Sequence, residues 1–338
     1  MDVTIVCRHA GGTAIWIAVG AVALAACGWR AGYDIADAPD TSTDAPVRSC
    51  AAPSGFDPLP SGTARDLTAA WVDGADRIWI AGVGSTVRVL DAGGWRDAST
   101  GLPPVGALLS FWSDGGLRLF AGTVGAVWAH DGATWSLATS LDDSACAWPV
   151  GVAGGAGYLY GACSYYHGVV RLRPDTGERE LLVDNIRGDF VHAFAPDDVF
   201  VIMGLGSVVF RYRGGNWSDR ASWTQVGQGG FLESVHDVWS PGDGQLVAVG
   251  DGGLIRRWDG RAWIREDSGT TANLLAVWGS PGDGLIAVGE DGVALHHDGQ
   301  RWRPLPTGTT ATLRAIRGRE CSHVVAIGDG GTVLRVVR

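Results

Sequence analysis

Lysine is absent from this chain of 338 residues, and all 26 basic residues are arginine. The absence excludes Schiff-base catalysis by lysine and the phosphate-binding P-loop, because both need that residue. Charged residues make up only 18% of the chain, so it is not a solvated, disordered polyelectrolyte. The net charge of −10 argues against a nucleic-acid partner, since nucleic acids are bound by neutralising their phosphates.

Glycine and tryptophan are abundant instead, at 52 and 16 residues. The glycines do not recur at every third residue, which excludes a collagen triple helix. Apolar residues make up 46% of the chain, which is enough to build a core. This composition predicts a globular protein with many short strands and tight turns.

The N-terminus has the pattern of a secretory signal peptide. Arg8 and His9 precede an apolar run from Ala14 to Ala26 that is 13 residues long. A helix needs about 20 apolar residues to span a bilayer, so this run is too short to do so. A basic start, a short apolar run and small residues at its end predict a signal peptide at residues 1–26.

The end of this run resembles the lipobox of bacterial lipoproteins, with Leu-Ala-Ala-Cys at residues 24–27. The resemblance implies that Cys27 is lipidated and becomes the mature N-terminus; the alternative is an ordinary cleavage site before a cysteine. Residues 27–50 are rich in Asp, Ala, Thr, Ser and Pro, so we expect a flexible tether. We therefore expect an exported protein anchored to a membrane by its lipid, at the periplasmic side of the outer membrane or at the cell surface.

A repeat of about 40 residues accounts for the rest of the chain. A glycine closes an apolar run seven times, at Gly82, Gly122, Gly161, Gly204, Gly250, Gly289 and Gly328. A second glycine follows each, and a turn then leads to a tryptophan at Trp95, Trp135, Trp217, Trp263 and Trp302. An earlier position in the repeat holds Trp71, Trp112, Phe194, Trp239 and Trp278, with Val150 and Arg317 as exceptions.

Each copy of the repeat predicts four short strands, which in the clearest copy are residues 274–278, 285–288, 293–297 and 301–305. Asp298-Gly299 between the last two strands predicts a two-residue hairpin turn. The second strand is apolar without alternation, as expected for a sheet covered on both faces. The sequence therefore predicts an all-β fold, a seven-bladed β-propeller of four-stranded antiparallel blades at residues 51–338.

The last blade lacks its fourth strand, because the final copy ends at Arg338. Residues 56–63, Phe-Asp-Pro-Leu-Pro-Ser-Gly-Thr, match the Trp-Arg-Pro-Leu-Pro-Thr-Gly-Thr of residues 302–309. We therefore expect this N-terminal strand to complete the last blade and close the ring, which removes the open sheet edge of a solenoid. We expect the protein to be a monomer.

The pattern Gly-Ser-Pro-Gly-Asp-Gly, an apolar run, Val-Gly-Glu-Asp-Gly and Asp-Gly-x-x-Trp resembles the propeller repeats of bacterial surface lipoproteins. It is distantly similar to BNR/Asp-box propellers and to photosystem II assembly factor-like propellers. The chain departs from the Asp-box Ser-x-Asp-x-Gly-x-x-Trp, because here aspartate and glycine are adjacent. The resemblance implies the fold and transfers no sialidase chemistry, since propellers host many functions.

Besides Cys7 in the leader and Cys27 at the predicted lipid site, four cysteines remain, and four allow three pairings. In the predicted third blade, Cys146 and Cys163 fall on one face, and Cys50 and Cys321 share a face of the last blade. We therefore predict the disulfides Cys146–Cys163 and Cys50–Cys321, the second of which would reinforce ring closure. The alternative is free or metal-binding thiols, and the chain has no CxxC pair to favour metal.

Two insertions interrupt the repeat in the third and fourth copies. Tyr165, Tyr166 and His167 lengthen the third copy between its paired glycines, and the connection in the fourth copy adds Arg220 and Trp223. We expect both insertions on one face of adjacent blades, where aromatic and arginine side chains suit a protein or glycan ligand. The structural alternative, which we favour, is that the tyrosines cover a disulfide and Trp223 fills a gap.

Catalytic motifs such as HExxH, GxSxG and GxGxxG are absent from the sequence. His192 and His236 enter the first strands of adjacent blades, and Asp237 beside His236 makes an acid–base pair at the central channel conceivable. Structural histidines are the favoured interpretation. Asp243 and Asp283 lie in Gly-Asp-Gly turns that supply one carboxylate each, so we predict no metal site and no cofactor.

The sequence as a whole predicts a lipid-anchored, extracytoplasmic propeller that binds a cell-envelope protein or glycan and is not an enzyme. Two alternatives stay open: a glycoside hydrolase or lyase with its active site at the central channel, and a structural surface protein without a dedicated ligand. An enzyme needs several charged side chains that converge at one end of the channel. A binding protein needs an aromatic patch over the third and fourth blades.

Overall fold

The computed structural model describes residues 3–9, 12–18, 50–104, 108–113, 119–123, 126–140, 149–155, 158–163, 168–173, 176–183, 188–195, 197–203, 208–228, 234–240, 245–280, 284–319 and 323–338. The chain divides into two units, Met1–Arg30 and Ala31–Arg338. In the first unit, β1 (Val3–His9) and β2 (Gly12–Ala18) pair as an antiparallel hairpin. No helix among the described residues is long and apolar enough to cross a membrane. The signal peptide, lipidated Cys27 and tether stay predictions.

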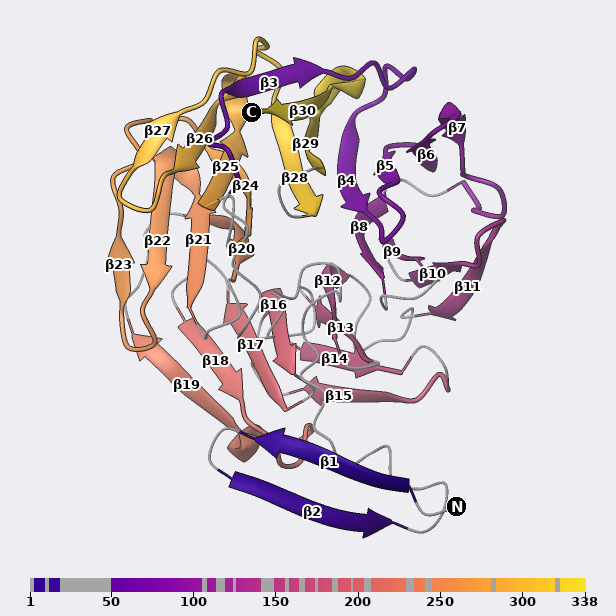
Figure 1. Cartoon of the computed structure of the whole chain (residues 1–338), viewed down its shortest axis with the longest axis vertical. Coiled ribbons are helices and arrows are strands. Elements are labelled where there is room, and N and C mark those ends of the chain that lie inside the picture. The colour runs from indigo at the N-terminus through magenta and orange to yellow at the C-terminus, as the bar shows by residue number, and fades with distance from the viewer. Residues whose placement is uncertain are drawn as a thin grey trace. The chain divides into compact units, whose positions relative to one another are not determined.

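In the second unit, the described strands form seven four-stranded antiparallel sheets, which we number as blades one to seven (Figure 1). Blades one to three consist of β4 Leu67–Val72, β5 Ile78–Gly82, β6 Thr86–Asp91 and β7 Gly94–Asp97; β8 Leu108–Ser113, β9 Leu119–Thr123, β10 Ala126–His130 and β11 Trp135–Ser140; and β12 Pro149–Gly155, β13 Tyr158–Cys163, β14 Gly168–Leu172 and β15 Arg179–Val183. Consecutive strands pair within each of these sheets, so each blade is a meander.

Blades four to seven have the same topology. They consist of β16 Gly188–Ala195, β17 Asp198–Met203, β18 Val208–Tyr212 and β19 Trp223–Gln228; β20 Val235–Trp239, β21 Leu246–Gly250, β22 Leu254–Trp258 and β23 Trp263–Arg265; β24 Leu274–Ser280, β25 Gly284–Gly289, β26 Ala294–His297 and β27 Trp302–Pro304; and β28 Leu313–Arg319, β29 His323–Gly328, β30 Val333–Val337 and β3 Gly55–Pro58. In blade seven, β3 pairs antiparallel with β30, with Phe56 opposite Val336.

The seven blades form a closed ring around their first strands (Figure 1). Each first strand contacts the first strand of the next blade, from β4 through β8, β12, β16, β20 and β24 to β28, and β28 contacts β4. The predicted fold class is therefore confirmed: the protein is a seven-bladed β-propeller. One end of the ring carries the 1–2 and 3–4 turns of the blades, and the other carries the 2–3 turns and the connections between blades.

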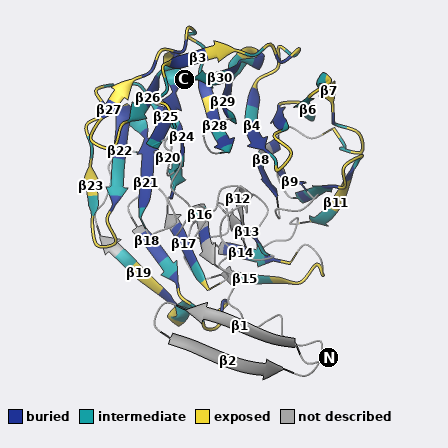
Figure 2. Cartoon of the chain, in the orientation of Figure 1, coloured by how far each residue is buried: buried dark blue, intermediate teal, exposed yellow. Residues whose placement is uncertain are grey.

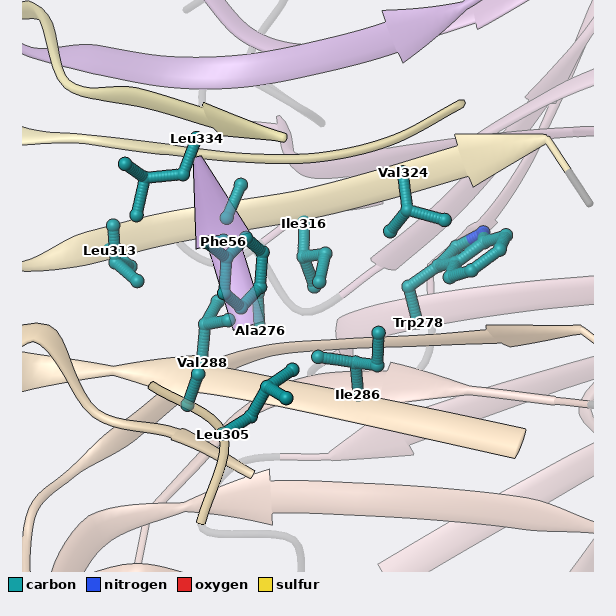
Figure 3. Packing of buried hydrophobic residues seen from close by; sticks show 12 residues of the cluster. Phe56, Ala276, Trp278, Ile286, Val288, Leu305, Leu313, Ile316, Val324 and Leu334 are labelled. Carbon is teal, nitrogen blue, oxygen red and sulfur yellow. The ribbon is translucent and has the colours of Figure 1, made fainter. Parts of the chain in front are cut away.

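The core lies between neighbouring sheets. Between blades six and seven, Trp278 and Ile286 pack against Ile316 and Val324, together with Phe56 from β3 (Figure 3). Inner strands are buried and outer strands are partly exposed, as the dark blue and yellow ribbons of Figure 2 show. Burial on both faces accounts for the unbroken apolar second strands of the repeat.

The paired glycines of the repeat mark close approaches of the backbone. In blade six, a Cβ at Gly289 would lie 2.0 Å from the Asn273 carbonyl oxygen, and one at Gly292 would lie 1.9 Å from that of Thr309. Gly292 also has a φ of +68°, which other residues rarely adopt. Thr309 belongs to the connection into blade seven, so the second glycine lets neighbouring blades meet.

The aspartates of the 3–4 turns fold those turns. Asp298 Oδ1 accepts the backbone N–H groups of Gln300 and Arg301, both at 3.0 Å. Asp131 and Asp259 accept the equivalent pairs of N–H groups in blades two and five. These hydrogen bonds are the main reason why the pKa of each of the three carboxyls is lowered. The repeated aspartates are therefore turn residues.

Candidate functional site

The pairing of β18 with β19 corrects the position of the insertion in blade four. Trp223 pairs with Tyr212 at the end of the third strand, as the strand-four tryptophans of blades five and six pair with the ends of their own third strands. Trp223, and not Trp217, is therefore the repeat tryptophan of blade four. The extra residues lie in the 3–4 connection, residues 213–222, and not in the connection to blade five.

The insertion of blade four thus lies at the end of the ring with the 1–2 and 3–4 turns, and its predicted place in the connection to blade five, at the other end, is wrong. Residues 213–222 join β18 to β19 at the end that carries the 1–2 and 3–4 turns. Tyr165, Tyr166 and His167 lie outside the described residues. They fall between β13 and β14, whose facing ends belong to the end with the 2–3 turns.

Trp223 belongs to the core of the seam between blades three and four. Its side chain is 3% exposed, and its Nε1 donates to the Trp217 carbonyl at 3.0 Å. The ring of Trp217 lies 4.8 Å from that of Trp223 and 5.7 Å from that of Tyr160. The Arg171 guanidinium, whose Nη2 donates to Glu180, lies 4.6 Å from the Trp217 ring. The burial of Trp223 argues against its predicted contact with a ligand.

Arg220 is held by contacts within the same insertion. Its Nη1 donates to the Trp223 carbonyl at 2.7 Å, and its Cζ lies 4.3 Å from the centre of the Phe210 ring. Asp219 caps the short 3-10 turn η3 (Arg220–Ser222) by accepting the Ala221 N–H at 3.0 Å. These bonds give the inserted segment a defined shape on the exterior of blade four.

The residues predicted for an acid–base pair do not combine. The His236 Nε2 lies 2.6 Å from Asp251 Oδ1, in the 3-10 turn η4 (Asp251–Gly253) of the same blade. This hydrogen bond is the largest reason why the pKa of the Asp251 carboxyl is lowered. Asp237 has other partners, and the side chain of His192 lies outside the described residues.

Asp237 joins three blades at the ring axis. Its Oδ1 accepts the Val238 N–H at 2.9 Å, and its Oδ2 accepts the Val277 N–H of β24 at 3.0 Å. The Nη1 of Arg317, on β28, lies 3.6 Å from the same Oδ2 and donates to the Ile316 carbonyl at 2.7 Å. Burial raises the pKa of the Asp237 carboxyl, against the opposing effect of Arg317 and the two N–H groups. The repeat pattern contains no signal for this cross-blade contact.

Arg317 stands at the position that holds tryptophan in blades one, two, five and six. A Cβ at Gly279 would lie 3.3 Å from Cη2 of Trp239, and a Cβ at Gly318 would lie 2.9 Å from Cη2 of Trp278. Each tryptophan thus packs against a glycine of the next blade. In blade one, the position of Gly279 and Gly318 is occupied by Val72, which is buried.

The cysteine predictions fall mostly outside the described residues. Cys50 is the one cysteine whose surroundings are described, and it is disulfide-bonded to a partner that is not among the described side chains. The side chains of Cys146, Cys163 and Cys321 are not described. The pairings Cys146–Cys163 and Cys50–Cys321 therefore stay predictions.

Among the described residues, no group of three or more His, Cys, Asp or Glu side chains could hold a metal ion. Asp243 and Asp283 lie outside them. Within the described part of the chain, the structure brings the Asp237 carboxylate and the Arg317 guanidinium together at the ring axis.

No protein-family model and no curated protein matches this chain. Solved structures match it in fold. The virginiamycin B lyase of Staphylococcus aureus is 12% identical with a TM-score of 0.71, and the alignment covers 84% of this chain and 99% of the lyase. YCF48 bound to D1 peptide is 17% identical with a TM-score of 0.68 and coverages of 86% and 99%. The WD40 propeller domain of Doa1 is 13% identical with a TM-score of 0.65 and coverages of 85% and 96%. Such identities show the propeller fold alone.

Proposed function

We propose that this protein is a lipid-anchored, extracytoplasmic propeller that binds a cell-envelope protein or glycan without catalysing a reaction. The proposal rests on one observation: the candidate catalytic side chains already make hydrogen bonds and ion pairs within the protein. His236 is paired with Asp251, and Asp237 is held by two backbone N–H groups and Arg317. A general acid or base needs a side chain that can reach a substrate proton.

Protein binding suits the scaffold, because a rigid ring can present loops of variable sequence at both ends. Two such loops are the insertion of residues 213–222 and the segment of residues 164–167. YCF48, which shares the fold, is known with a D1 peptide bound. The tyrosines at residues 165 and 166 are of a kind that is enriched at protein interfaces.

Lipid anchoring through Cys27 is supported by the sequence of the leader. Ala51 lies where the chain enters the ring, and its carbonyl accepts a hydrogen bond from Arg338 Nη1 at 2.7 Å. β3 therefore starts at the end with the 1–2 and 3–4 turns. A tether at that end leaves the opposite end, with the 2–3 turns, free for a partner.

The anchor is tested by Cys27→Ser. We expect the variant to leave the membrane fraction and to lose incorporation of an alkyne-labelled fatty acid, because the acceptor sulfur is gone. Cys7→Ser is the matched control, since that cysteine lies in the leader. Continued fatty-acid labelling of the Cys27→Ser protein would contradict the anchor.

Binding is tested by site-specific photo-cross-linking in intact cells, because amine-reactive reagents have no lysine to modify. A photoreactive residue at Tyr166 should capture a discrete envelope component, and one at Asp291, an exposed residue in the 2–3 turn of blade six, serves as the control. The captured component should then bind the purified protein, and Tyr166→Ala should weaken that binding. Equal amounts of heterogeneous cross-linked products at both positions would contradict a binding surface at residues 165–167.

A lyase is the second candidate, because the structural alignment with the virginiamycin B lyase covers 99% of the lyase. Quinupristin is bound in another structure of the virginiamycin B lyase, so the test is incubation of the purified protein with quinupristin, followed by chromatography. Conversion that Asp237→Asn abolishes would establish the enzyme. Unchanged quinupristin at high protein concentration would leave the binding function.

A further inference from the structure

We propose that the ring axis carries a binding site for a carboxylate monoanion, with Arg317 as the residue that receives it. This site is independent of the partner surface proposed above. Arg317 lies on β28, the first strand of blade seven, at the position that holds tryptophan in blades one, two, five and six. The arginine extends to Asp237 of blade five, with its Nη1 3.6 Å from Asp237 Oδ2.

The guanidinium of Arg317 is anchored at one nitrogen and open at the others. Both of its recorded contacts, with the Ile316 carbonyl at 2.7 Å and with Asp237 Oδ2 at 3.6 Å, use Nη1. Within the described part of the chain, Nη2 and Nε have no recorded partner, and the side chain is 36% exposed. An arginine held in this way presents two parallel N–H groups, the geometry that binds a carboxylate in bidentate fashion.

Asp237 gives the site its preference for a single negative charge. Its Oδ2 is near Arg317, and its pairing with the Val277 and Val238 N–H groups fixes its position. The carboxylate of Asp237 offsets part of the positive charge of Arg317, so a second negative charge on the ligand would be repelled. A monocarboxylate is therefore accepted more readily than a phosphate dianion. Asp237 acts here as a positioning and specificity residue.

The test is isothermal titration calorimetry of the full-length protein with sodium acetate, at constant ionic strength. We expect saturable binding that Arg317→Gln weakens at least tenfold. Arg314→Gln is the matched control, because Arg314 is an exposed arginine on the same strand that is paired with Asp329, and its binding should equal that of the wild type. Circular dichroism confirms that both variants are folded. Equal loss in both variants, or no saturable heat with the wild type, would overturn the site.

A second variant tests the charge argument separately from folding. Asp237→Asn removes the repelling carboxylate, so the ratio of phosphate affinity to acetate affinity should rise at least fivefold. An unchanged ratio would show that Asp237 does not select the ligand charge.

Two further titrants identify the source of the carboxylate: acetyl-triglycine and acetyl-triglycinamide. Tighter binding of the acid than of acetate, with none of the amide, assigns the site to a protein C-terminus, whereas equal binding of acetate and the acid assigns it to a small metabolite.

Discussion

Trp278 of blade six packs directly over Gly318 of blade seven, where an added Cβ would lie 2.9 Å from Cη2 of the indole. The contact predicts that Gly318→Ala is destabilising. The added methyl group would overpack the seam and lower the unfolding free energy by about 1–3 kcal/mol, because the indole is buried and cannot move into solvent. Urea denaturation measures the loss.

Gly74→Ala is the matched control for this change, because nothing lies within 4 Å of a Cβ at Gly74. We expect it to change the unfolding free energy by no more than about 0.5 kcal/mol. Similar losses in the two variants would show that the glycine of the seam has no special packing role.

Trp223 provides a prediction that separates core packing from ligand contact. Its indole is 3% exposed, so Trp223→Ala should cost about 3–5 kcal/mol of unfolding free energy. Leu137→Ala is the control, because Leu137 is 52% exposed and should give a change near zero. Full stability of Trp223→Ala, together with a loss of partner binding, would restore the surface role that the sequence suggested.

The misplaced insertion shows where sequence reasoning reaches its limit. Gly214-Gly215-Asn216-Trp217 has the form of a turn followed by a tryptophan, and so does Asp298-Gly299-Gln300-Arg301-Trp302. Both patterns predict the start of a fourth strand. The backbone pairing of Tyr212 with Trp223 decides between the two tryptophans, and that pairing is a tertiary fact. The predicted number of blades is not affected by this error, because it rests on the spacing of the glycines.

The Asp237–Arg317 contact could not be predicted from the sequence for a different reason. A repeat relates equivalent positions along the chain; at one of them Arg317 replaces an aromatic residue, and the pattern gives no partner for it. The two side chains come from blades five and seven and meet only because the ring is closed. Contacts across an axis depend on the geometry of the whole ring, which no local pattern encodes.

Asp237 predicts a specific pH dependence of stability. Burial raises its pKa in the folded protein above the usual value of 3.8. The folded protein therefore binds a proton at this site more readily than the unfolded chain, so the contribution of Asp237 to stability rises as the pH falls through the raised pKa toward 3.8. Relative to Asp237→Asn, the wild type should gain stability as the pH is lowered from 7 through this window. Urea midpoints of the two proteins across that range test the sign, and a constant difference would contradict the burial of the charge.

His297 predicts the opposite dependence. Burial lowers its pKa below 6.5, and its Nδ1 accepts the Gly299 N–H at 3.2 Å beside the ring of Trp302. Protonation at Nδ1 would remove that acceptor, so the unfolded chain binds the proton more readily than the folded protein. Stability should therefore fall as the pH drops through 6.5 toward the lowered pKa. His297→Gln keeps a side chain that can accept a hydrogen bond and has no proton to bind, so its melting temperature should fall less than that of the wild type between pH 7 and pH 5. Parallel melting curves for the two proteins would show that this imidazole does not couple folding to protonation.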